Sequence, residues 1–212
     1  WNQVQAFTAV FAELGNVTIN YTAGTGGSVS KTSETVAPAS GTPTGSLATA
    51  DDGYEFLYWI NAATKQIVLY ADGNRAPEHI TPQKNPTTGV YEDITYQAVF
   101  GALSDVAYTV EHYKVDGQGN VSVYTTEHLT GTTGRGVTAT PIDTTNTLGW
   151  EGYEYTPKYK GDGIGEVAEG TVAGDGSTVL RLFYTATDMA YTVLRYQLNG
   201  DGTITILDPL NL

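Results

Sequence analysis

Three histidines carry the strongest metal-ligating side chains of this sequence, which has no cysteine. If a hairpin pairs Val115 with Val121, strand rise places His112 and His128 about 13 Å apart along the sheet. Zinc requires ligand nitrogens about 2 Å from one ion, so this pair does not form a zinc site. His79 lies by itself in a Pro-rich loop. The sequence therefore predicts no metal site and no cofactor.

Several loops resemble ligand-binding motifs only superficially. DGQGN (116–120) and NGDGT (199–203) contain alternating oxygen-bearing residues, but they lack the distal bidentate Glu of a calcium loop. GTGGS and GTTGRG lack the Gly-Lys-Ser/Thr ending of a phosphate-binding loop. Asp51 and Asp52 are adjacent in a loop, which favours a solvated turn. No nucleophile motif is present, so we expect a protein that is not an enzyme.

Lysine chemistry offers one further possibility, an intramolecular amide between a Lys and an Asn or Asp side chain. Such a bond needs a nearby catalytic carboxylic acid and an apolar core. Lys114, on a predicted first strand, is the geometric favourite among the six lysines. The competing interpretation, an ordinary exposed strand lysine, is the favoured one.

Two aromatic clusters are the best functional lead, because Tyr and Trp give large contact areas with a polar group. If GYEFLYW (53–59) forms a strand, its side chains alternate between two faces. This alternation predicts Tyr54, Phe56 and Tyr58 on one face and Leu57 and Trp59 on the other. In WEGYEYTPKY (150–159) the candidate ligand-binding residues are Trp150, Tyr153, Tyr155 and Tyr159. For each single residue, a role in the core is the more common alternative.

The composition predicts that the elements which position these aromatic residues are mainly β-strands. The fold class is therefore mainly β, or α+β if short helices are present. The 212 residues include 25 Gly and 15 Tyr, with many Thr and Val, and no long stretch has helical periodicity. Predicted strands span 107–115 and 121–128, which form a hairpin, and the closing strands span 94–100 and 178–184. Hairpin, irregular crossover and closing strands favour small β-grasp-like modules, with β-sandwich modules as the alternative.

Internal repetition sets the domain organisation. YTVEHYKVDGQGNVSV (108–123) returns as YTVLRYQLNGDGTITI (191–206), and Gly-Tyr-Glu-aromatic occurs at 53–56 and 152–155. We therefore expect the tail strand of an upstream repeat at 1–14, a first repeat at 15–103, a second at 104–188, and the start of a truncated one at 189–212. The sequence accordingly looks like a piece of a longer protein.

The net charge of −13 limits the classes of partner. Nucleic-acid binding needs clustered cations, whereas the arginines here are scattered, and an anionic membrane surface would repel the chain. No transmembrane run is present. We therefore expect neither nucleic-acid binding nor membrane insertion by this segment.

The repeats resemble modules of Gram-positive bacterial surface proteins. VTINYTAGTGGSVSKTSETV, GYEFLYW and YQAVF in the first repeat are similar to internalin B-type repeats. TKQIVLYADGNRAPEHITP is inserted there before the closing strand. YTVEHYKVDGQGNVSVYTTEHLTGTTGRGVTA, GYEY and STVLRLFY in the second resemble mucin-binding-protein type repeats. The resemblance implies β-grasp-like tandem modules on wall-anchored proteins, with no catalytic residues.

The function expected from these observations is a non-enzymatic, extracellular adhesin segment at the bacterial cell wall surface. Its partner would be a host glycoprotein, with mucin and immunoglobulin as the two candidates. The alternative is a structural stalk that projects another binding domain and has no ligand of its own. In either role we expect the segment to be monomeric within a longer chain.

Overall fold

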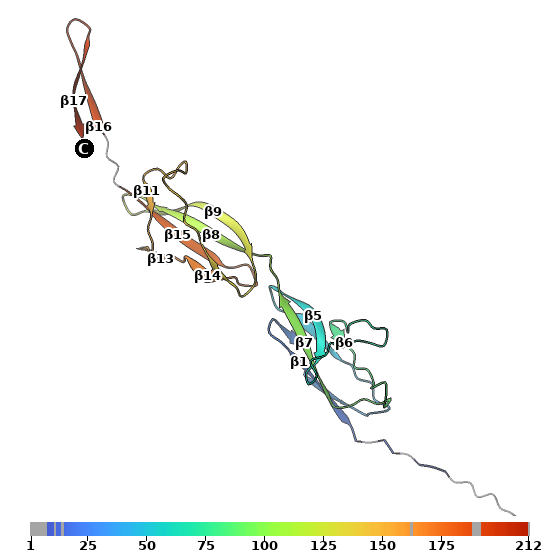
Figure 1. Ribbon diagram of the computed structural model, residues 1–212. Coiled ribbons are helices and arrows are strands. Elements are labelled where there is room, and N and C mark those ends of the chain that lie inside the picture. The colour runs from blue at the N-terminus through green and yellow to red at the C-terminus, as the bar shows by residue number, and fades with distance from the viewer. Residues whose placement is uncertain (1–7, 11, 14, 162, 188–191, 212) are drawn as a thin grey trace, which may run out of the picture. The chain divides into compact units, whose positions relative to one another are not determined.

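A computed structural model describes residues 8–10, 12–13, 15–161, 163–187 and 192–211 of the protein. All regular structure in these residues is β, and they contain no helix (Figure 1). The mainly β fold class is thereby confirmed. Its origin lies in the abundance of β-branched and aromatic residues, which pack well on a pleated surface.

The chain divides into two compact units. The first unit comprises Trp1–Val106 with the short segments Thr130–Arg135 and Val172–Ser177. The second unit comprises Ala107–Leu129, Gly136–Thr171 and Thr178–Leu212. The repeat boundaries derived from the sequence remain predictions.

The main sheet of the first unit is mixed, with the order β3-β1-β7-β5; Figure 1 labels β1, β7 and β5 of this sheet. The two central strands, β1 and β7, are parallel and in register from Ile19↔Ile94 to Ala23↔Ala98. Both edge strands are antiparallel to their neighbours. The bounds of these strands are β1 Val17–Ala23, β3 Ser33–Val36, β5 Tyr54–Asn61 and β7 Ile94–Ala102.

A second, antiparallel sheet of the first unit has the order β2-β4-β6, with bounds Gly27–Val29, Ser46–Ala50 and His79–Ile80. The core draws on both sheets: Ile19, Tyr21 and Trp59 come from the main sheet, and Ala48 and Ile80 from the other. The indole N–H of Trp59 donates to the carbonyls of residues 77 and 78, at 3.0 and 3.1 Å. This buried tryptophan therefore also anchors the segment that leads into β6.

The second unit contains a mixed sheet with the order β11-β15-β8-β9. Its parallel central pair, β8 and β15, runs in register from Thr109↔Val179 to Val115↔Thr185. The strand bounds are β8 Val106–Val115, β9 Val121–Gly131, β11 Tyr153–Tyr155 and β15 Val179–Ala186. Two short antiparallel pairs accompany it, β10 (Gly136–Thr138) with β14 (Glu169–Thr171), and β12 (Lys160–Gly161) with β13 (Ile164–Gly165).

The two units share one strand order. In each unit the opening strand (β1 or β8) and the closing strand (β7 or β15) are parallel and lie at the centre of the sheet. The strand beside the opening strand (β3 or β9) forms one edge. The strand that begins at the tyrosine of Gly-Tyr-Glu (β5 or β11) forms the other edge. The internal repetition of the sequence thus corresponds to a repeated sheet. In the described residues irregular segments, not helices, make the crossovers, and the narrower β-grasp assignment remains a prediction.

The predicted facing of GYEFLYW is wrong beyond Phe56. The pairing of β5 with β7 shifts register between Phe56 and Tyr58, which leaves Leu57 in a bulge. Phe56 and Trp59 consequently pack in the same core, with ring centroids 6.2 Å apart. An inserted residue reverses the alternation, and the sequence pattern alone does not reveal it.

The chain's last described strands form an antiparallel hairpin, β16 (Thr192–Leu198) with β17 (Ile204–Asn211). Its turn lies at Asn199–Gly202, where the Asn199 amide donates to the Thr203 carbonyl at 2.8 Å. A hairpin with this turn is what the sequence predicted for the truncated repeat.

Candidate functional site

The first predicted binding residue, Trp150, belongs to the interior of the second unit, with only 2% of its surface exposed. Its ring centroid lies 4.4 Å from that of Tyr184 and 4.8 Å from that of Tyr124. His112, on β8, contacts it edge-on at 6.4 Å. Trp150 is therefore part of an aromatic core in this structure.

Tyr153 covers the ammonium group of Lys114. The Lys114 Nζ lies 4.4 Å from the Tyr153 ring centroid, 3.6 Å from that of Tyr124 and 4.8 Å from that of Trp150. Burial lowers the pKa of Lys114, and the charge of Glu151 partly opposes this. The same Nζ donates a hydrogen bond to the carbonyl of Gly149. The protein's own cation thus fills a site that could otherwise suit a ligand's ammonium group.

Tyr155 and Tyr159 also have partners within the unit. The Tyr155 hydroxyl donates to Glu166, and burial together with this bond raises the pKa of Tyr155 to about 12. Tyr159 stacks on Phe183 at 4.6 Å, and Tyr113 stacks on the same ring at 4.8 Å. Each of the four predicted binding residues is thus engaged intramolecularly, and their role in ligand binding remains a prediction.

His112 and His128 occupy very different environments. His112 is buried, its Nδ1 lies 2.9 Å from the Tyr184 hydroxyl, and burial lowers its pKa. Its Nε2 lies 3.3 Å from Glu127 without the geometry of a hydrogen bond. His128 and His79 are exposed. Among the described residues no three His, Asp or Glu side chains gather closely enough to hold a metal ion.

The DGQGN turn stabilises itself. The Asp116 carboxylate accepts the amides of Gln118 at 2.9 Å and Asn120 at 2.8 Å, and Gly119 has a φ of 85°. These bonds, together with the left-handed glycine, account for the sequence of the turn as a hairpin connection.

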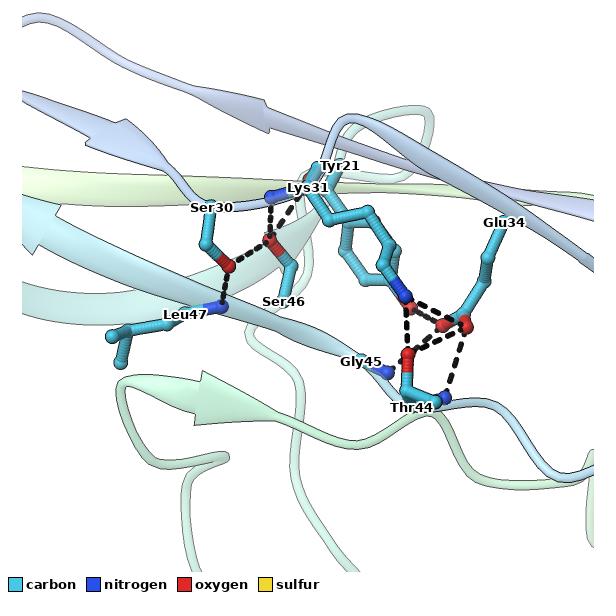
Figure 2. Close-up of polar contacts among 8 residues, drawn as sticks. All are labelled: Tyr21, Ser30, Lys31, Glu34, Thr44, Gly45, Ser46 and Leu47. Carbon is cyan, nitrogen blue, oxygen red and sulfur yellow. Dashed lines mark hydrogen bonds and ion pairs between the residues drawn. The ribbon is translucent and has the colours of Figure 1, made fainter.

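A polar network in the first unit centres on Glu34 of β3 (Figure 2). Its carboxylate accepts hydrogen bonds from the Tyr21 hydroxyl at 2.5 Å, the Thr44 amide at 2.9 Å and the Gly45 amide at 2.9 Å. Lys31 is more distant, with Nζ 3.5 Å from the carboxylate. The network ties the crossover segment that precedes β4 to β1 and β3.

Hydrogen bonding sets the ionisation of Glu34. Burial alone would raise its pKa, but the bonds from Tyr21, Thr44 and Gly45 outweigh burial and hold the pKa at about 2. Burial, reinforced by the same bond to Glu34, raises the pKa of Tyr21.

Ser46 forms a second centre, because its hydroxyl donates to the Lys31 carbonyl at 2.8 Å and accepts the Lys31 amide at 3.0 Å (Figure 2). We interpret both centres as loop anchors.

A cavity of about 550 Å³ lies in the first unit, beside the segment that connects β5 to β7. This volume falls within the range of small-ligand sites. Ile19, Ile80 and Tyr96 contribute buried residues to its lining, and Tyr70 and Tyr91 contribute half-buried rings. The inserted segment 64–82 is visible in the sequence, but its residue pattern does not predict a cavity.

Main-chain hydrogen bonds shape this cavity. The Tyr70 amide donates to the Asn74 carbonyl at 2.8 Å, and the Tyr70 hydroxyl accepts the Thr81 amide at 2.9 Å. The Tyr91 amide donates to the carbonyl of Pro38 at 2.9 Å. Tyrosines separated by an irregular insertion are a signal that could have pointed to this site, but only the fold brings them together.

Comparison with protein families finds a match between residues 17–89 and the divergent InlB B-repeat domain. The comparison with curated proteins gives no match. No helix in the described residues is long and apolar enough to cross a membrane. The match does not support the resemblance of the second repeat to mucin-binding repeats. It does support the predicted internalin B-type repeat, a domain associated with bacterial surface or extracellular proteins.

Proposed function

We propose that this chain is a non-enzymatic adhesin segment of a Gram-positive cell-wall protein, and that its tandem units bind a host glycoprotein. The surface-repeat character follows from the match over residues 17–89. The observation that carries a binding role is the 550 Å³ cavity of the first unit, because a pure spacer needs no concave polar and aromatic site. Mucin-type glycoproteins are the favoured partners.

Immunoglobulin is the rival partner, and strand β9 is the feature that favours it. This long strand lies at the edge of its sheet and exposes Val123 and Leu129. A free edge can accept an added strand from another protein. Binding of this kind would use the main chain of β9 and would not require the cavity.

A stalk without a ligand is the alternative function. It is favoured by the intramolecular engagement of Trp150, Tyr153, Tyr155 and Tyr159, which leaves none of them as an unpaired anchor. A monomeric tethered array would serve either role.

Retention experiments separate these functions. The immobilised chain is exposed to mucin, immunoglobulin and serum glycoproteins, and retained species are titrated by surface plasmon resonance. We expect saturable binding of a mucin-type glycoprotein. A folded Tyr153→Ala/Tyr155→Ala variant tests the second unit, because binding that survives this change does not use that surface. Retention of none of these proteins at about 100 μM would contradict the adhesin and support the stalk.

A further inference from the structure

Tyr96 lines the cavity in the first unit, and its hydroxyl group distinguishes it from the other buried lining residues, Ile19 and Ile80. The residue is 6% exposed and lines the cavity, yet no hydrogen bond joins its hydroxyl to any residue that the structure describes. Burial raises its pKa to about 12, and the neighbouring Tyr70 and Tyr91 add to this. The hydroxyl is not among the fully buried unpaired atoms of the described residues, so it keeps contact with solvent and is available to a ligand in the cavity.

The remaining lining provides the contacts that a small polar ligand needs. Tyr70 and Tyr91 present partly exposed aromatic rings, which can cover the apolar C–H face of a sugar. Gln66 and Gln83 have exposed side chains in the lining, where an amide can both donate and accept. Such a mixture of ring surfaces and a few polar groups is typical of sites that fix a ligand's orientation.

The charges of the lining disfavour an anionic ligand. Its cation, Lys84, already donates to the Ala39 carbonyl at 2.5 Å and lies 5.5 Å from the Tyr91 ring centroid. Glu92 and Asp93 contribute two carboxylates. The whole chain carries a net charge of −13, which adds to the repulsion of anions.

We propose that this cavity is a binding site for a short neutral saccharide, with the Tyr96 hydroxyl hydrogen-bonded to a sugar hydroxyl. The inference deepens the proposed adhesin function and rests on it for its biological meaning. It places glycan recognition in the cavity of the first unit. The sequence had suggested the aromatic cluster of the second unit, which comprises Trp150, Tyr153, Tyr155 and Tyr159.

The test is a titration of the whole chain, observed by ¹H–¹⁵N NMR, with lactose, N-acetyllactosamine, chitobiose and maltose up to about 20 mM. Sialyllactose serves as the anionic comparison. We expect at least one neutral sugar to shift the amides near Tyr70, Tyr91 and Tyr96 saturably, and sialyllactose to bind more weakly than lactose. No saturable shift around the cavity with any neutral sugar would overturn the proposal.

Two variants sharpen the test. Tyr96→Phe keeps the buried ring and removes only the hydroxyl, so we expect about three- to tenfold weaker sugar binding and an unchanged melting temperature. Tyr58→Phe is the matched control, since Tyr58 lies on β5 in the same unit and does not line the cavity. Equal sugar affinity of Tyr96→Phe and the wild-type chain, or a marked loss of stability in Tyr96→Phe, would overturn the assignment of this hydroxyl.

The outcomes also distinguish the site from the wider function. Retention of a glycoprotein without any sugar response at the cavity would reject the site and leave the adhesin proposal standing. A sugar response lost in Tyr96→Phe, without retention of any glycoprotein, would support the site and reject the proposed class of partner.

Discussion

Glu34 and Tyr96 are both largely covered by the first unit, and they differ in how their polar atoms are satisfied. The Glu34 carboxylate accepts bonds from Tyr21, Thr44 and Gly45, whereas the Tyr96 hydroxyl has no hydrogen-bond partner among the described residues. Hydrogen bonds to a covered carboxylate stabilise a fold, whereas the Tyr96 hydroxyl keeps contact with solvent in the cavity and stays open to a ligand. The contacts of Glu34 are structural, and our proposal gives the Tyr96 hydroxyl a role in binding.

Replacement of Glu34 by Gln should change how stability depends on pH. The folded-state pKa of about 2 lies below the ordinary value of 4.5, so the unfolded chain takes up this proton first as the pH falls. The carboxylate's contribution is therefore fully present above pH 4.5 and is lost progressively between pH 4.5 and about 2. We expect Glu34→Gln to lower the free energy of unfolding at pH 7 by about 2 kcal/mol and to flatten its fall in this window.

Urea denaturation of Glu34→Gln at a series of pH values measures this effect. Glu55→Gln is the matched control, because Glu55 is an exposed carboxylate on β5 of the same unit. A Glu34→Gln protein that loses stability with acid as steeply as the wild type would show that other carboxylates dominate the response.

Among the secondary-structure elements, the hairpins and closing strands could be predicted from the sequence and the bulge could not. Strand β8 was expected at 107–115 and spans Val106–Val115, because alternation and turn residues are local signals. The extra residue at Leu57 follows from how β5 pairs with β7, which is a long-range property. The same reason explains the cavity, since Tyr70, Tyr91 and Tyr96 are brought together by strand pairing and not by their spacing.

The approach of β4 to β6 provides a prediction at the scale of elements. Gly45, just before β4, has a φ of 78°, and a Cβ there would lie 1.9 Å from the Ile80 carbonyl oxygen. Gly73 has a similar φ of 80° but no atom within 4 Å of its Cβ position. We expect Gly73→Ala to cost about 1 kcal/mol and Gly45→Ala about 3 kcal/mol or more in unfolding free energy, as measured by urea denaturation. Equal costs would show that backbone conformation, and not the close contact with β6, sets the requirement for glycine.

For the whole molecule, repetition in the sequence predicted repetition in the structure. Both units place parallel opening and closing strands at the centre of a four-stranded sheet, although few residues are identical between them. Turn residues and strand patterning carry this shared topology, so side chains outside the core are free to diverge. The first unit has used that freedom for an insertion and a cavity, and the second for an aromatic cluster around Lys114.

The net charge of −13 leads to a prediction about the molecule as a whole. Ion pairs such as Lys31–Glu34 and Arg181–Glu111, both at 3.5 Å, are partly exposed and contribute little, so repulsion among the excess carboxylates should dominate. Salt shortens the screening length from about 30 Å at 0.01 M to about 10 Å at 0.1 M. We therefore expect the melting temperature at pH 7 to rise by about 3 °C over this range of NaCl.

Scanning calorimetry measures this rise, and a second pH provides the control. Near pH 4.4, the isoelectric point, the net charge vanishes and the rise in melting temperature with salt should disappear. A fall in melting temperature with salt at pH 7 would mean instead that favourable ion pairs outweigh the repulsion.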